Sequence, residues 1–458
     1  MKISCLGGGG YYFLGPLGYI AANARLRGSR VDLYDIDRER ALMMADTARR
    51  FSAETGGGLD VRVGRTVAEA VDGADFVIAS IGGAGASGSL GYYHSPLHIN
   101  DCIIAAKHGV PQIVGDTCGP AAMAAAFRSV PIYLDICREM ERRAPNAIML
   151  NHANPMAVLC RAMNKYSGVR GVVGICHGVQ GGIHSMAKLL GLPAGELDVR
   201  WIGTNHYYWV MSVRHRGKDV LPKLWKRAVK GPIDPAHRMA RDLSLLHGHW
   251  ILYPADDHIV EFYPFLAQMG GRRPWAYALA ESYHGKDLMP FYRGRKTIKD
   301  VIAADRRTPR AKMLADYRRR LDAAKPPQGE ESLHSHESSS ALIADISTGS
   351  RRVHILNIPN RGSIPNLPPE AVMEVECVTD SAGVRGVYMG EAPLALEAIL
   401  RKRIAWQELV ADAAVKGDRK LALQAMMIDE QAVLPGASEA MLEELLRSSR
   451  KMLPQFRF

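Results

Sequence analysis

Residues 2–10 read KISCLGGGG, a short apolar run that passes directly into four glycines. A helical pattern follows over 11–26, and the next apolar run, 29–34, is followed by Asp35. This order of strand, glycine turn, helix, strand and acid predicts a dinucleotide-binding unit. Only glycine lets the backbone approach a pyrophosphate, and the helix N-terminus offers it free N–H groups. Asp35 is placed to bind the adenosine ribose, which favours NAD over NADP.

Strand and helix patterns alternate up to about residue 195 and predict an N-terminal, Rossmann-like doubly wound sheet. We expect further strands at 59–64, 75–83, 112–116, 147–151 and 172–178. We expect helices at 38–57, 67–71, 103–108 and 121–143, the last with a kink or break at Pro131. Ligands of such sheets bind at the carboxyl ends of the strands, so Asn154, Cys176 and His177 should converge there.

The pattern changes from about residue 196, where strands and long basic helices mix. We expect strands at 199–203, 209–213, 353–356 and 374–379, and helices at 308–324, 338–348 and 394–427, with a turn at 417–418. The predicted fold is therefore α/β, similar to lactate and malate dehydrogenases. It has an NAD-binding domain over 1–195 and an α+β domain for catalysis, substrate binding and oligomerisation over 196–458.

Composition is that of an ordinary globular chain, with 58 Lys and Arg against 47 Asp and Glu over 458 residues. The excess of +11 is modest and its basic clusters lack interleaved aromatics, so we expect no nucleic-acid partner. The seven cysteines form no CxxC pair, which argues against a disulfide framework. No signal peptide and no run of about 18 apolar residues is found, so we expect a cytoplasmic protein with no membrane partner.

Two segments carry residues suited to chemistry. Cys176 and His206 combine a thiolate with an imidazole, a set that suits Mn, Fe, Co, Ni or Zn, although lone Cys and His residues are more often structural. The segment PADDHIVEFYP at 254–264 places two acids and a histidine between aromatics. Asp256 or Asp257 could cap a helix there, and the other could act as a base.

Short motifs along nearly the whole chain resemble those of glycoside hydrolase family 4, the NAD- and metal-dependent glycosidases. They are YDID at 34–37, ADFVI at 74–78, NHANPMA at 151–157, GICHGVQG at 174–181, GTNH at 203–206, HIVEF at 258–262, NIPNRG at 357–362, NLP at 366–368 and GDR at 417–419. The Cys-His and Asn-His segments together are the specific part of this likeness.

The resemblance implies an unusual hydrolysis. NAD+ takes a hydride from C3 of the sugar, a base removes the acidified C2 proton, the C1 group is eliminated, water adds, and the steps reverse. The resemblance implies that a divalent metal, with Mn2+ the first choice, is held by Cys176 and His206 and stabilises the enediolate. It implies a base among Asp256, Asp257 and Tyr253, and assistance from His177 at the leaving group.

The resemblance and the fold together give the remaining site residues. We expect the cofactor to be bound by Gly7, Gly9, Gly10, Phe13, Asp35, Gly82 and Asn154. We expect the sugar to be bound by Asp116, Arg128, Asn154, His177, Asn205 and His258. The small-molecule partner is then a glycoside, and the family resemblance favours a homodimer or homotetramer.

Departures from the family pattern bear on the substrate. The glycine turn ends in Gly10 where serine is usual, GPAA stands at 119–122 in place of GPGG, and Gly178 replaces a serine. Residues 82–91 hold no arginine, which argues against a 6-phosphorylated sugar. The preferred substrate is an α-glycoside with an anionic C6, a sulfoquinovoside or a glucuronide or galacturonide.

Other readings stay open. An α-glucosidase, α-galactosidase or 6-phosphoglycosidase would share the mechanism. A hydroxy-acid dehydrogenase shares the fold start but needs no Cys176–His206 pair, and a regulator that senses NAD would bind it without turnover.

Overall fold

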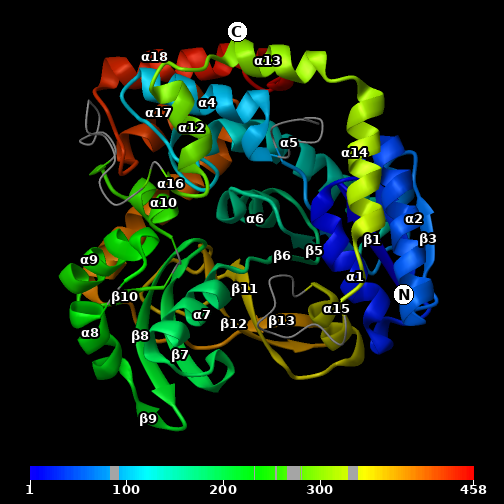
Figure 1. The fold of residues 1–458 in the computed structure, drawn as a ribbon, viewed down its shortest axis with the longest axis horizontal. Helices are drawn as coiled ribbons and strands as arrows, with labels where there is room; N and C mark the ends of the chain where they lie inside the picture. The colour runs from blue at the N-terminus through cyan, green and yellow to red at the C-terminus, as the bar shows by residue number, and fades with distance from the viewer. Residues whose placement is uncertain (83–91, 232, 253–254, 266–278, 280, 328–338) are drawn as a thin grey trace.

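The protein is described here by a computed structural model covering residues 1–82, 92–231, 233–252, 255–265, 279, 281–327 and 339–458. Figure 1 shows two sheets surrounded by helices. The strands are β1 (Lys2–Leu6), β2 (Arg30–Tyr34), β3 (Asp60–Val63), β4 (Phe76–Ala79), β5 (Ile148–Asn151), β6 (Gly171–Gly174), β7 (Leu197–Thr204), β8 (Tyr207–His215), β9 (Lys218–Asp219), β10 (Trp250–Ile251), β11 (Val353–Pro359), β12 (Val372–Asp380) and β13 (Gly383–Gly386).

The helices of the first half lie between the parallel strands or follow them. They are α1 (Leu14–Ala22), α2 (Arg38–Thr55), α3 (Val67–Val71), α4 (Pro96–Lys107), α5 (Gly119–Arg143), α6 (Met156–Tyr166) and α7 (Gly178–Leu190). Those of the second half are α8 (Leu221–Lys230), α9 (Arg238–His247), α10 (Asp256–Ile259), α12 (Gly285–Tyr292), α13 (Ile298–Arg307), α14 (Arg310–Ala323), α15 (Ser339–Thr348), α16 (Leu394–Lys416), α17 (Arg419–Ile428) and α18 (Pro435–Ser448).

The large sheet has the strand order β3-β2-β1-β4-β5-β6-β11-β12-β13. Its first six strands are parallel, and their order is that of a doubly wound dinucleotide-binding sheet. The predicted Rossmann-like fold is therefore confirmed. Strands β11 to β13 continue the same sheet in antiparallel fashion, with Asn357 opposite Gly174. The sheet thus crosses residue 195, and the domain boundary stays a prediction.

The small antiparallel sheet has the strand order β10-β8-β7, with β9 beside β8, and it carries the predicted metal ligand His206. Strands β7 and β8 are joined by two residues only, Asn205 and His206. His206 has a φ of 62°, the left-handed conformation that closes so short a connection. The turn fixes the direction in which the His206 ring leaves the backbone.

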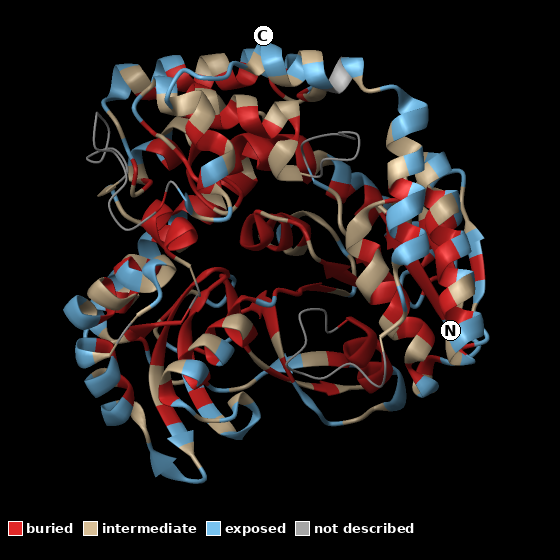
Figure 2. Cartoon of the chain, in the orientation of Figure 1, coloured by how far each residue is buried: buried red, intermediate tan, exposed pale blue. Residues whose placement is uncertain are grey.

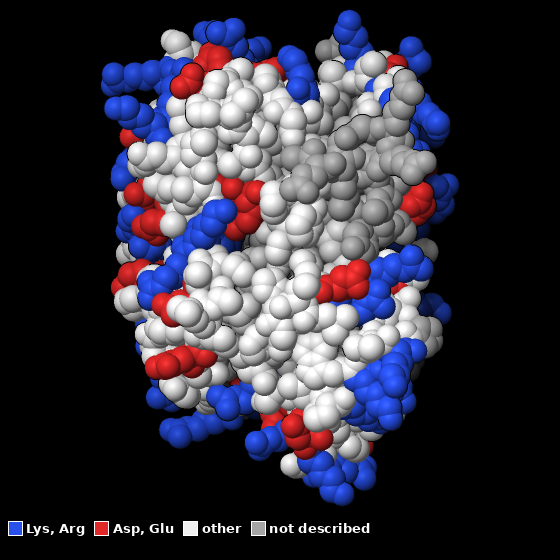
Figure 3. All heavy atoms as spheres, turned by 90° about the vertical axis from the view of Figure 1, so that its left-hand side faces the viewer, with Lys and Arg blue, Asp and Glu red and all other residues white. Residues whose placement is uncertain are grey.

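Burial follows this architecture. Figure 2 shows the central strands β1, β4 and β5 of the large sheet and helix α6 largely buried. The edge strands β3 and β13 and helix α14 have exposed residues. On the face in Figure 3, Lys and Arg stand mainly near the margins, with Asp and Glu among them. Among the described residues, none of the helices combines the length and apolar character needed to cross a bilayer.

One expectation about local structure is wrong, and another is wrong in part. Residues 112–116 form no strand but an irregular segment before α5, because their N–H groups are bonded to a carboxylate instead of a neighbouring strand. Helix α5 contains Pro131 and runs unbroken from Gly119 to Arg143, so the expected break does not occur, and a kink at Pro131 stays a prediction. Residues 119–130 of this helix are all buried, and their packing offsets the hydrogen bond lost at proline.

Candidate active site

The glycine turn after β1 has the geometry that a dinucleotide requires. Gly7 has a φ of +82°, and a Cβ on it would lie 2.4 Å from the carbonyl oxygen of Ser80, so only glycine fits. The Gly9 N–H donates to the Asp35 carboxylate at 2.9 Å, and the Asp37 N–H donates to its other oxygen at 2.8 Å. Asp35 therefore stands beside the turn at the carboxyl end of β2, where the sequence predicts it.

The remaining predicted cofactor residues are placed less uniformly. Gly10 closes the turn by donating to the Gly7 carbonyl at 2.8 Å, and Gly82 lies just after β4 at the same edge. The side chain of Phe13 is fully buried in the core, and its predicted contact with the cofactor stays a prediction. The Tyr317 hydroxyl of α14 donates to the Gly9 carbonyl at 2.7 Å, a contact that the sequence did not suggest.

The predicted metal pair is brought together. Cys176, after β6, and His206, at the β7–β8 turn, are both buried, and the Cys176 Sγ lies 3.2 Å from the His206 Nε2. The Gly178 N–H donates to the same sulfur at 3.3 Å. Burial raises the pKa of the Cys176 thiol and lowers that of His206 to about 3, which keeps the imidazole neutral. One cation bound between the two atoms would have a thiolate and an imidazole as ligands, a set that transition metals accept.

Asp116 is the centre of a hydrogen-bond network beside this pair. Its carboxylate accepts from Tyr93 at 2.8 Å, from Asn154 at 2.7 Å and from the adjacent Thr117 hydroxyl at 2.6 Å. The Thr117 oxygen in turn lies 2.9 Å from the His206 Nδ1. Asp116 and Asn154, both predicted to bind the sugar, are thus joined directly.

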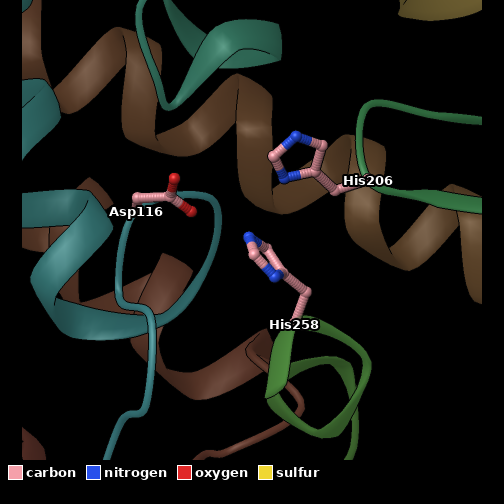
Figure 4. A group of neighbouring side chains, drawn as sticks. All are labelled: Asp116, His206 and His258. Carbon is pink, nitrogen blue, oxygen red and sulfur yellow. The ribbon is translucent and has the colours of Figure 1, made fainter. Parts of the chain in front are cut away.

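His258, from α10, completes the cluster in Figure 4, where Asp116, His206 and His258 point toward one another. One ligand atom from each lies within 4.8 Å of the others. Burial acts against the charged imidazole, but the bond to Asp257 (3.2 Å) and the Asp116 carboxylate raise the pKa of His258 above its usual value. Burial likewise acts against the charged form of Asp116, but His258, His206 and the donated bonds lower its pKa.

The structure separates the two neighbouring acids. Asp256 accepts the N–H groups of Met239 and Ala240, each at 2.9 Å, and so caps the first turn of α9. Burial raises its pKa to about 7. Asp257 instead faces His258 and belongs with His258 and His284 to a second group of close ligand atoms. Tyr253 lies outside the described residues.

Three further predicted residues meet different surroundings. Arg128, which the sequence predicts to bind the sugar, is buried. It donates to Asp101 at 2.6 Å and so forms an interior ion pair. Asn205 donates to the buried Glu374 at 3.2 Å, behind the His206 turn. His177 is exposed at the start of α7, next to Cys176.

Sequence reasoning missed the residue that builds the loop carrying Asp116. Glu261 accepts the N–H groups of Ile113, Val114 and Gly115 at 2.6, 2.9 and 3.1 Å. Burial raises its pKa to about 7 despite these bonds. The available signal for Glu261 was its place in HIVEF, three residues after His258. Thr117 offered only its position next to Asp116, and Tyr93 offered no signal in the sequence.

Comparison with known proteins identifies the family. The model "Family 4 glycosyl hydrolase" matches residues 2–192 and that of its C-terminal domain matches 201–432. An alpha-galactosidase of Bacillus subtilis (strain 168) is 27% identical, with 100% of each chain covered. An alpha-galacturonidase of the same organism is 27% identical over 94% of this chain and 93% of its own.

Solved structures share the fold. A 6-phospho-alpha-glucosidase from gut microorganisms in complex with NAD and Mn2+ superposes with a TM-score of 0.76 at 20% identity, covering 100% of this chain and 99% of its own. A lactate dehydrogenase from a deep-sea metagenome library reaches 0.51 at 12% identity, over 90% and 98%. With both family models matched in order along nearly the whole length, the chain belongs to the family 4 glycosyl hydrolases.

Proposed function

We propose that this chain hydrolyses an α-glycoside with the help of NAD+ and a divalent metal, with Mn2+ the first choice. The carrying observation is the buried pair of Cys176 Sγ and His206 Nε2, 3.2 Å apart, at the carboxyl edge of a sheet that also carries the glycine turn. A simple hydroxy-acid dehydrogenase has no use for such a pair.

The residues present fit both groups. A Cβ on Gly7 would lie 2.4 Å from the Ser80 carbonyl oxygen, so the tight turn that a dinucleotide requires needs glycine there. The Asp35 carboxylate has lone pairs left beyond its two backbone bonds. Thiolate and imidazole suit Mn2+, Fe2+, Co2+ or Zn2+. When bound, the two cofactors supply reversible hydride transfer and Lewis-acid polarisation of sugar oxygens, the chemistry implied by the family resemblance.

The chain's own residues supply the proton handling. Asp257 holds the Nδ1 side of the His258 ring, and the rest of that ring faces the space between Asp116 and His206 in Figure 4. An imidazole oriented by a carboxylate is the usual arrangement of a general base. We therefore assign the removal of the sugar C2 proton to the Asp257–His258 pair and not to Asp256, whose oxygens cap α9.

The proposed substrate carries an anionic group at C6. Several relatives with full-length similarity are named alpha-galacturonidases, and the excess of basic residues tolerates such a sugar. The sulfoquinovoside expected from the sequence belongs to the same chemical class. Relatives named alpha-galactosidase and 6-phospho-alpha-glucosidase define the competing substrates.

The test is a panel of nitrophenyl α-hexosides with NAD+ and Mn2+: galacturonide, glucuronide, sulfoquinovoside, galactoside, glucoside and 6-phosphoglucoside. We expect cleavage of an anionic member, no net NADH, and exchange of the C2 proton with solvent deuterium. The Cys176→Ala variant should lose Mn2+ binding and cleavage, whereas Cys137→Ala, a buried cysteine in α5, should keep both. NADH accumulation on a hydroxy acid without glycoside cleavage would overturn the proposal.

The cytoplasmic location and the homodimer or homotetramer stay predictions. Sedimentation velocity of the purified protein measures the second, and a purely monomeric species contradicts it.

A further inference from the structure

One hydroxyl group lies between the Asp116 carboxylate and the imidazole of the proposed metal ligand. The Thr117 Oγ1 donates to Asp116 Oδ1 at 2.6 Å and lies 2.9 Å from the His206 Nδ1. The opposite ring nitrogen of His206, Nε2, lies 3.2 Å from the Cys176 Sγ. Carboxylate, hydroxyl, imidazole and thiol thus form one chain of polar contacts in the interior.

The number of protons available decides which atom donates and which accepts in each of these contacts. A carboxylate only accepts hydrogen bonds, so the single hydroxyl proton of Thr117 is used on Asp116. The Thr117 oxygen then has only lone pairs to offer His206, and the proton between them must sit on Nδ1. The His206 Nε2 is left without a proton, with its lone pair toward Cys176, which is the form that binds a metal.

Both polar partners of Thr117 are held in place by the fold. Glu261 accepts the N–H groups of 113–115 directly before Asp116, which fixes the loop. His206 is confined by a two-residue turn with a φ of 62°. The position of the His206 ring is therefore set without Thr117. The contact with Thr117 selects which nitrogen of that ring carries the proton.

We propose that Thr117 is a positioning residue that selects the Nδ1–H tautomer of His206 and so prepares Nε2 for the metal. The inference rests on the proposed function, because it takes the metal to lie between Cys176 and His206. The alternative metal position, among Asp116, His206 and His258 in Figure 4, would require Nδ1 as the ligand and hence the loss of the Thr117 bond.

The experiment compares Thr117→Val, which keeps the shape but removes the hydroxyl, with Thr117→Ser, which keeps the hydroxyl. Cobalt(II) is titrated into metal-free protein, and the thiolate-to-cobalt absorption reports occupation next to Cys176. We expect Thr117→Val to weaken Co2+ and Mn2+ binding by about 10- to 100-fold, the usual effect of losing a bond behind a ligand. Thr117→Ser should stay near wild type, and the NAD+ affinity of both should be unchanged.

A second measurement needs neither metal nor activity. Nitrogen-15 spectra of histidine-labelled, metal-free protein, with His206 assigned from a His206→Gln variant, report its tautomer. The Nδ1–H form in wild type and in Thr117→Ser, but not in Thr117→Val, supports the inference. An Nε2–H form in wild type overturns it without any Thr117 variant.

The outcomes separate the two proposals. If wild type shows the thiolate–cobalt absorption and Thr117→Val binds equally well, the role of Thr117 is refuted and the proposed function stands. If wild type binds cobalt without that absorption, and Thr117→Val binds as tightly or more tightly, the metal lies among Asp116, His206 and His258. Both the proposed metal site and the inference then fail.

Discussion

Replacing Arg128 by methionine separates a structural role from the expected sugar-binding role. The side chain of Arg128 is 0% exposed and that of its partner Asp101 is 1% exposed, with 2.6 Å between Nη2 and Oδ2. Arg128 also donates to Ser449 at 2.9 Å. The variant would leave the Asp101 carboxyl buried without its cation, and breaking such a pair on one side costs about 3–5 kcal/mol. We expect a loss of free energy of unfolding in that range.

The assay is urea unfolding followed by circular dichroism, with the loss computed from the shift of the midpoint at an unchanged denaturant slope. The matched control is the double variant Arg128→Met with Asp101→Leu. It should recover most of the stability, because replacing both members of a buried pair by apolar groups is often neutral or stabilising. The KM of both variants for the cleaved glycoside should change little.

The reasoning is refuted if Arg128→Met unfolds at the wild-type urea concentration while KM rises by about tenfold, equivalent to about 1.4 kcal/mol of lost binding. The guanidinium would then serve the sugar, as the sequence suggested, and its bond to Asp101 would be incidental.

Three further predictions concern other parts of the site. Asp256→Ala should lower the free energy of unfolding by about 0.5–2 kcal/mol, because the cap of α9 is lost. Asp257→Ala should lower kcat by about 10²- to 10⁴-fold with little change in the free energy of unfolding. Steady-state rates and urea midpoints test both variants, and an exchange of the two effects would contradict the assignment. Gly7→Ala places a Cβ 2.4 Å from the Ser80 oxygen at a φ of +82°, so calorimetric titration should show weakened NAD+ binding, and wild-type affinity would argue against a cofactor at this turn. Burial raises the pKa of Glu261 from 4.5 to about 7, so the folded protein holds that proton more tightly than the unfolded chain. The stabilising contribution of this group therefore falls as the pH rises from about 4.5 to about 7 and is constant above that range. In Glu261→Gln the urea midpoint should vary less with pH across this window, and a pH dependence equal to that of wild type would contradict the pKa shift.

The proposed role of Thr117 and the base assignment depend on contacts between distant segments. Thr117 and His206 lie 89 positions apart in sequence, and Glu261 meets residues 113–115 across about 146 to 148 positions. No local pattern reports such pairs, because a carboxylate that accepts three backbone N–H groups leaves no periodicity in the sequence. The expected strand at 112–116 is the clearest case. Its apolar residues suggested a sheet, but the partner of its N–H groups is the side chain of Glu261.

The neighbouring acids in ADDH at 255–258 show the same limit at the scale of one bond. Local reasoning could say that one acid caps a helix and the other serves chemistry, but not which. The choice was made by α9, whose first N–H groups lie against Asp256 and leave Asp257 to His258.

The sequence by itself determined the dinucleotide-binding sheet, the family and the Cys176–His206 pair. These depend on local periodicity, on glycine where a side chain would collide, and on residue types with few alternatives. The tertiary structure alone decided which of the two acids caps α9, that Arg128 is buried against Asp101, and which nitrogen of His206 faces the sulfur. Each of these depends on hydrogen-bond contacts between atoms that only folding brings together.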